Sequence, residues 1–211
     1  MWESFISLLV NLMSFLTEIL GHNIGLSILV TTLVVRFALL PLSLKIADGA
    51  LRRQRDINEL QPELDKIKSR YQDDPQQVSK KTLALYKERG ISLMDGKSLL
   101  IGLIQAPVFI AMFTAIKKLV SSGDSFLWIQ NIASPDVILT VVAAGLTYLA
   151  TVAGPNMTAQ GKTMMTWLPV FLTLFFLWKL SAGIGLYWVG SNIVSVLQSI
   201  IMRRRAQTLQ A

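Results

Sequence analysis

The chain has 211 residues, a formal net charge of +7 and no cysteine. Apolar residues make up 52% of it and charged residues only 16%, whereas a typical soluble domain has about 25% charged residues. This composition favours an integral membrane protein over a soluble one, and the lack of cysteine excludes disulfides, zinc–thiolate sites and thiol chemistry.

Residues 1–21 are predicted to form an amphipathic helix that lies in the membrane interface. Large apolar side chains recur at helical spacing, and most polar side chains fall on the opposite side. The apolar side carries Phe5, Leu8, Leu9, Leu12, Phe15, Leu16 and Ile19, and the polar side carries Glu3, Ser7, Asn11, Ser14 and Glu18. A secretory signal peptide is the alternative, but its usual basic start is replaced here by Glu3. The pattern therefore favours the interfacial helix.

Five apolar segments follow, most of which approach the roughly 20 residues that a helix needs to cross a bilayer. The predicted spans are about residues 23–44, 98–116, 137–153, 164–178 and 184–202. The fourth is short, which requires a thinner bilayer or the inclusion of flanking residues. The predicted fold class is therefore all-α, a polytopic membrane protein with five transmembrane helices.

Residues 45–97 form the only sizeable polar segment and are predicted to be a cytoplasmic helical hairpin. Apolar residues spaced three and four apart form a coiled-coil-like seam in its first arm. Asp74 and Pro75 are typical of the start of a second helix, and Gly90 is typical of its end. The seam residues are Ile57, Leu60, Leu64, Ile67 and Tyr71.

The basic residues are divided unevenly between the two sides of a five-span topology. Sixteen of the twenty Lys and Arg residues fall on one side, in segment 45–97, at Lys162 and in the run 203–205. The other side receives only Lys117, Lys118 and Lys179. The positive-inside rule therefore predicts an outer N-terminus and a cytoplasmic C-terminus. Because the charge follows the topology, it gives little support to sequence-specific nucleic-acid binding.

Arg36 stands in the middle of the apolar run "LVTTLVVRFALLPL", where a charge costs roughly 2.5–3.5 kcal/mol on insertion scales. No Asp or Glu lies within any predicted span, so no carboxylate there can neutralise Arg36. The simplest expectation is that its guanidinium is surrounded by water. Thr32 lies one turn earlier on the same helical face. Further polar residues follow one side of the last span, and Gln105 lies in the second span. The stripe on the last span comprises Trp188, Ser191, Asn192, Ser195, Gln198 and Ser199.

These polar groups predict a hydrated groove that opens toward the cytoplasm, since in hydrocarbon they must face one another or a wet cavity. For any single hydroxyl the alternative is an ordinary interhelical hydrogen bond, which contributes about 0.6 kcal/mol. The residues predicted to form the groove are Thr32, Arg36, Gln105, Trp188, Ser191, Asn192 and Ser195.

The chain has few of the residue combinations that enzymes use for catalysis. Its only histidine, His22, falls at the predicted outer interface, and no carboxylate pair or metal-binding cluster is apparent. We therefore expect no enzyme activity, no metal and no cofactor. A groove with one fixed positive charge suits an anionic or acidic polypeptide segment. One alternative is a transporter or channel for an anionic solute that uses Arg36, although the sequence lacks the internal repeats typical of transporters. A second alternative is a purely structural subunit.

Five stretches, in this order along the chain, resemble the YidC/Oxa1/Alb3 family of membrane protein insertases. They are "NIGLSILVTTLVVRFALLPLSLK", "LQPELDKIKSRYQDDPQQVSKKTLALYKERGI", "LIQAPVFIAMF", "WLPVFLTLFFLW" and "AGIGLYWVGSNIVSVLQ". Each is weakly specific alone, but the set in this order is specific. The stretch "KLSAGIG" departs from the family pattern because it lacks a proline before the last span.

The resemblance implies an insertase core over residues 22–211, with five helices around a hydrophilic groove in a bacterial plasma (inner) membrane. It implies a protein that inserts hydrophobic segments of nascent membrane proteins without nucleotide hydrolysis. The implied partners are these nascent chains and membrane lipids, with the Sec translocon and the ribosome as further candidates. It also implies groove roles for Thr32, Arg36 and Gln105, and substrate contact at Trp188.

Overall fold

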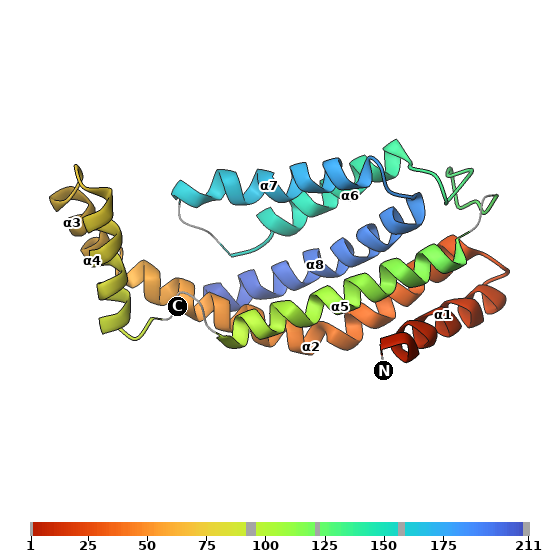
Figure 1. The fold of residues 1–211 in the computed structure, drawn as a ribbon, viewed down its shortest axis with the longest axis horizontal. Helices are drawn as coiled ribbons and strands as arrows, with labels where there is room; N and C mark the ends of the chain where they lie inside the picture. The colour runs from red at the N-terminus through yellow and green to blue at the C-terminus, as the bar shows by residue number, and fades with distance from the viewer. Residues whose placement is uncertain (1, 92–95, 121–122, 156–158, 209–211) are drawn as a thin grey trace. The chain divides into compact units, whose positions relative to one another are not determined.

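The structure is a computed structural model that describes the chain except residues 1, 92–95, 121–122, 156–158 and 209–211, and except the side chains of 96–105, 159–162 and 165. The described residues form eight helices (Figure 1). These are α1 (Trp2–Ile19), α2 (Ile24–Glu59), α3 (Gln61–Arg70), α4 (Pro75–Glu88), α5 (Gly96–Leu119), α6 (Val137–Val152), α7 (Ala159–Leu177) and α8 (Ala182–Thr208).

The chain divides into two compact units, which are described separately. Unit 1 comprises Met1–Leu44 and Ala106–Ala211, and unit 2 comprises Lys45–Gln105. Unit 1 therefore holds the segments predicted to cross the membrane, apart from the start of the second, and unit 2 holds the predicted cytoplasmic hairpin. The all-α fold class predicted from the sequence is confirmed for the described residues.

The helices of unit 1 are apolar, but they differ in length. Among the described residues, α2 and α8 are long and apolar enough to cross a membrane. Helix α6 has 16 residues, or about 24 Å at 1.5 Å per residue. Helix α7 starts at Ala159 and has 19 residues, so it gains length from the flanking residues that the short fourth span required. The number of spans stays a prediction.

A single apolar core joins the helices of unit 1. Helix α6 packs against both α7 and α8, and side chains of α1, α2, α5 and α8 meet in the same cluster. Its fully buried members include Met13, Ile28, Met112, Ile116 and Ile184. Burial of such side chains contributes about 1.5–3 kcal/mol each relative to water, although α-helix packing within lipid gains mainly from close contact.

The link between α1 and α2 is a tight turn that ends α1 abruptly. Gly21 adopts a φ of 70°, a left-handed conformation that glycine adopts without steric cost. The N–H of His22 then donates to the carbonyl of Thr17 at 2.7 Å, which is the bond expected one residue beyond a left-handed helix end. Thr17 also donates to Ser27 at 2.9 Å, so α1 is tied to the start of α2.

Unit 2 contains a hairpin with its own small core. Side chains of α3 and α4 pack together around Leu60, Leu64 and Leu85. Helix α4 begins where the sequence predicted, since Asp74 caps it by accepting from the N–H groups of Gln76 and Gln77. It ends with Gly90 at a φ of 67°. The start and end predicted for this helix are confirmed.

The first arm of the hairpin differs from its prediction. The seam from Ile57 to Tyr71 was expected to lie on one helix, but α2 ends at Glu59 and α3 begins at Gln61. Pro62 lies in the first turn of α3, and a proline within a helix has no N–H to donate and clashes with the carbonyl four residues earlier. A single helix through Leu60 would therefore lose a hydrogen bond at this point.

Candidate functional site

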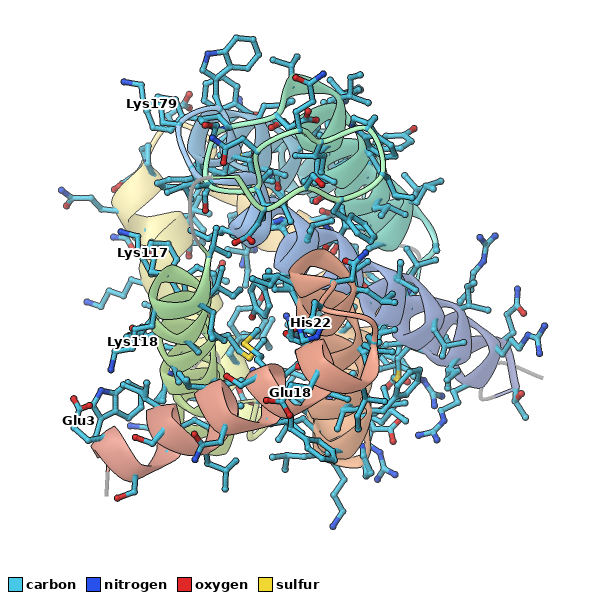
Figure 2. All side chains as sticks on the ribbon, turned by 90° about the vertical axis from the view of Figure 1, so that its right-hand side faces the viewer. Glu3, Glu18, His22, Lys117, Lys118 and Lys179 are labelled. Atoms are coloured by element: carbon cyan, nitrogen blue, oxygen red, sulfur yellow. The ribbon has the colours of Figure 1, made fainter. Side chains whose placement is uncertain are left out.

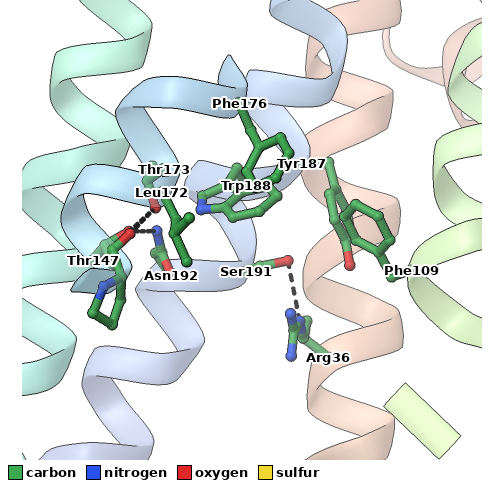
Figure 3. A pocket seen from close by; sticks show the side chains of 11 residues that line it. Arg36, Phe109, Thr147, Leu172, Thr173, Phe176, Tyr187, Trp188, Ser191 and Asn192 are labelled. Carbon is green, nitrogen blue, oxygen red and sulfur yellow. Dashed lines mark hydrogen bonds between the residues drawn. The ribbon is translucent and has the colours of Figure 1, made fainter. Parts of the chain in front are cut away.

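A pocket of about 340 Å³ lies within unit 1, between α2, α5, α6, α7 and α8 (Figure 3). It brings together four residues that the sequence predicted for the groove, namely Arg36, Trp188, Ser191 and Asn192. The rest of its lining comes from Phe109, Thr147, Pro169, Leu172, Thr173, Phe176 and Tyr187. None of these described lining residues is an Asp or Glu, so the pocket combines one positive charge with neutral polar groups and an aromatic wall.

Among the described residues, Arg36 is held by a hydrogen bond and not by an ion pair. Its Nε donates to Ser191 Oγ at 3.1 Å, and Figure 3 shows the guanidinium on the α2 side of the pocket facing α8. Arginine has five N–H donors, and within the described part of the chain Arg36 forms no other hydrogen bond. The charge is therefore positioned by a neutral partner, and its terminal nitrogens have no partner among the described residues.

A second hydrogen bond joins the same two helices farther along. Ser43 Oγ donates to Gln198 Oε1 at 2.9 Å, seven residues beyond Arg36 on α2 and seven beyond Ser191 on α8. Equal spacing on both helices means that α2 and α8 run parallel in this region, with a repeat of two helical turns. This pair of contacts sets the rotation of α2 that turns Arg36 toward the pocket.

Asn192 joins α8 to α6 on the opposite side of the pocket. Its Nδ2 donates to Thr147 Oγ1 at 2.8 Å and to the carbonyl of Ala143 at 3.2 Å. Thr147 also lies 3.2 Å from Thr173 Oγ1, on α7. Because both hydrogens of the amide nitrogen are used, the side chain is oriented, and three helices are linked through one polar network.

We expect Thr147→Val to destabilise unit 1, because valine keeps the shape of threonine but cannot bond to Asn192 or Thr173. Loss of an interhelical hydrogen bond in a membrane protein costs about 0.6 kcal/mol on average and up to about 1.7. Reversible unfolding in mixed micelles measures this change. Thr151→Val is the matched control, because the Thr151 hydroxyl bonds to the carbonyl of Thr147 in its own helix. Equal effects of the two variants would contradict a role for the network.

The aromatic wall of the pocket is built around Phe109 of α5. Its ring centroid lies 5.9 Å from that of Trp188, edge to face, and 5.8 Å from that of Tyr187. The Tyr187 hydroxyl is buried and has no partner among the described residues. Sequence reasoning did not find Phe109, Leu172 or Phe176. A single sequence gives no signal for them, because an apolar helix position looks the same whether it faces lipid or a pocket.

Three residues predicted for the groove are not among the described residues that line the pocket. Thr32 is fully buried, its hydroxyl donates to the carbonyl of Ile28 at 2.6 Å, and its methyl group faces Gly190. Ser195 donates to the carbonyl of Ser191 at 3.0 Å and does not line the pocket. The Gln105 side chain lies outside the described residues. Their roles in a groove stay predictions.

The pocket can hold a chain that has both polar and apolar parts. Arg36 can donate to carboxylates or peptide carbonyls, and the aromatic wall can contact apolar side chains. Among the described residues, no group of three or more His, Cys, Asp or Glu residues could hold a metal ion. The described lining residues therefore offer groups that can bind and orient such a chain.

The family described as "60Kd inner membrane protein" matches residues 15–209. The "Membrane protein insertase YidC" of Clostridium tetani (strain Massachusetts / E88) is 33% identical over 192 residues, which cover 89% of this chain and 84% of that protein. The chain belongs to this family. The "Membrane protein insertase YidC 2" of Bacillus anthracis is 34% identical, with 95% of this chain and 80% of that protein covered.

A solved structure of the same family has a similar fold. The "Active YidC insertase crystal structure with the first transmembrane domain resolved" matches with a TM-score of 0.64 and 25% identity, over 93% of this chain and 45% of that chain. Some family members are much longer, since the relative from Actinobacillus succinogenes (strain ATCC 55618 / DSM 22257 / CCUG 43843 / 130Z) is covered over only 38% of its length. The family resemblance seen in the sequence and the interpretation as a membrane protein insertase are confirmed.

Proposed function

We propose that this membrane protein insertase receives hydrophobic segments of nascent membrane proteins in the Arg36 pocket and releases them into the bilayer without nucleotide hydrolysis. The observation that carries the proposal is the composition of the pocket. One wall offers a cation that has no carboxylate partner among the described residues, and the facing wall offers Phe109 and Trp188. A polar segment that flanks a transmembrane helix can bind the first wall while the apolar segment contacts the second.

Insertion by the purified protein is the test of this function. We expect liposomes that contain only this protein to insert a synthesised substrate chain, measured by its protection from added protease. Empty liposomes are the control. Saturable flux of an anionic solute without insertion would favour the transporter alternative. Addition of the Sec translocon or of ribosomes to the same assay tests these two candidate partners, which we propose as optional.

We further propose that the protein lies in the bacterial inner membrane with an outer N-terminus and a cytoplasmic C-terminus. Lys117, Lys118 and Lys179 lie at one end of unit 1 (Figure 2), whereas Arg203, Arg204 and Arg205 lie in the last turns of α8. The end with fewer basic residues is assigned to the outer side by the positive-inside rule.

Reporter fusions test this orientation. A reporter that is active only in the cytoplasm should be active when fused at Gln72, in the hairpin, and silent when fused at Asp124, between α5 and α6. The charge difference across the membrane supplies the reason. Activity at Asp124 together with silence at Gln72 would overturn the proposed topology.

The surface of helix α1 fits a position at the outer membrane–water interface, because the helix has one buried face, one exposed apolar face and one exposed polar face. One face is buried in unit 1 through Ile6, Leu9 and Met13. A second is apolar but exposed, and a third is polar. The exposed apolar face includes Phe5, Leu8, Phe15 and Ile19, and the polar face includes Glu3, Ser7, Asn11 and Glu18. We propose that the apolar face contacts lipid while the polar face contacts water, as in other interfacial helices.

A further inference from the structure

The connection between α5 and α6 contains a tight turn that is held by backbone hydrogen bonds. Phe126 and Ile129 exchange both of their bonds, with N–O distances of 2.9 and 2.8 Å. The N–H of Ile132 donates to the carbonyl of Asp124 at 2.8 Å. Figure 1 places this connection at the same end of unit 1 as the α1–α2 and α7–α8 connections. The turn is therefore a defined structural element at that end.

Side chains on either side of the turn fasten it to the helices. Phe126, Ile129 and Ile132 are buried in the core of unit 1. The Phe126 ring lies directly on Gly25, since a Cβ built on that glycine would be 2.4 Å from Cγ of the ring. Only a residue without a side chain permits this approach. The base of the turn is thus fixed on α2.

The tip of the turn presents two apolar side chains outward. Leu127 is 75% exposed and Trp128 is 48% exposed. Leu127 has a φ of 51°, a left-handed conformation that is uncommon for any residue except glycine and unfavourable for a bulky one. Strained backbone conformations of this kind cluster where a side chain has a function. The turn therefore keeps Leu127 outward at a cost in backbone energy.

The Trp128 ring is also oriented by its neighbours. Its Nε1 donates to Asp136 Oδ1 at 3.3 Å, and the same carboxylate oxygen caps α6 by accepting from the N–H of Leu139 at 2.6 Å. The polar edge of the indole is therefore tied to the start of α6. A tryptophan with one satisfied polar edge and an exposed apolar face is typical of the boundary between lipid headgroups and acyl chains.

We propose that Leu127 and Trp128 form a lipid anchor that inserts into the headgroup–acyl boundary of the leaflet at this end of unit 1. Basic residues at the same end complement a phospholipid surface, because Lys117 and Lys179 (Figure 2) can pair with lipid phosphates, whereas Lys118 Nζ lies 4.0 Å from Glu3 Oε2. Since Phe126 rests on α2 and Asp136 caps α6, the anchor sets the depth of the helices that surround the pocket. The inference rests on membership of a membrane protein family and is independent of the insertase mechanism and of which leaflet this end faces.

Spin labels on single cysteines test the anchor, since the natural chain has none. We would place labels at Leu127→Cys and Trp128→Cys in vesicles of phosphatidylethanolamine and phosphatidylglycerol, with Gln130→Cys as the exposed polar control in the same loop. Both anchor labels should be several-fold more accessible to oxygen than to a water-soluble nickel chelate, at a depth of about 5–10 Å. The control should favour the nickel chelate.

Two results would overturn the proposal. Equal nickel accessibility at Leu127, Trp128 and Gln130 would place the tip in water. Exclusion of both reagents at the tip would mean that protein, and not lipid, covers it. Insertion activity measured on the same vesicles separates this question from the proposed function, because an inactive protein can still carry a correctly anchored tip.

A second variant tests Leu127 without changing the backbone. Asparagine tolerates the left-handed conformation better than leucine, so Leu127→Asn should fold with unchanged or higher thermal stability. In this background the label at Trp128→Cys should move toward water, with a several-fold rise in nickel accessibility. An unchanged depth in a folded Leu127→Asn protein would show that Leu127 is no part of an anchor.

Discussion

Replacing Arg36 with alanine should remove most insertion of substrates whose translocated segments are acidic. The guanidinium is the only charge that lines the described pocket, and a hydrogen bond to a charged group contributes about 1.5–3 kcal/mol. Loss of that contact in the step that limits insertion corresponds to a decrease of roughly 10- to 150-fold. Arg36→Lys should retain more activity than Arg36→Ala because it keeps the charge. Insertion into liposomes of matched substrates with acidic and neutral tails measures the difference.

The neutral partner of the arginine supplies the control. Ser191→Ala removes the 3.1 Å bond to Arg36 Nε and leaves the charge in place. If the positive charge of Arg36 binds the substrate, Ser191→Ala should resemble Arg36→Lys. Its loss of insertion activity should then be similar for substrates with acidic and with neutral tails. If Ser191→Ala instead loses as much as Arg36→Ala, with low levels of both proteins in the membrane, the arginine serves structure through its hydrogen bond. Full activity of Arg36→Ala on acidic tails would refute the proposed role of the charge.

Single cysteines at three consecutive residues of α8 should differ strongly in their reaction with a small water-soluble thiol reagent. Asn192 lines the pocket, Ile193 is 47% exposed and apolar, and Val194 is 3% exposed. A hydrated thiol with a pKa of about 8.5 is roughly a quarter ionised at pH 8, and only the thiolate reacts. We therefore expect fast labelling at Asn192→Cys and very slow labelling at Ile193→Cys and Val194→Cys.

Ile193→Cys is the control that separates contact with water from mere exposure. Ile193→Cys is accessible but should lie against lipid, where a thiol does not ionise, so exposure alone cannot explain a difference from Asn192→Cys. Thr32→Cys should also stay unreactive because Thr32 is fully buried. Reagent on the cytoplasmic side should label Asn192→Cys faster than reagent outside. Protection of Asn192→Cys from both sides would mean a dry pocket, and equal labelling from both sides would favour a channel.

The sequence by itself determined the features that depend on neighbouring residues. Helical segments, the cap at Asp74 and the stop at Gly90 could be predicted because capping and turn chemistry act over a few residues. The importance of Arg36 could also be predicted, since an arginine in an apolar run is costly wherever its helix lies. Sequence also indicated the uneven distribution of basic residues, which needs only the order of the spans.

The tertiary structure decided which polar groups meet. The stripe on α8 is divided, because Ser191 faces Arg36 whereas the amide nitrogen of Asn192 turns toward α6. Thr32 shares a face with Arg36 in sequence, yet it packs against Gly190. Periodicity gives the side of a helix on which a residue lies, but not which neighbour that side faces. That depends on helix rotation and on close contacts between residues more than 150 positions apart, which only the folded chain specifies.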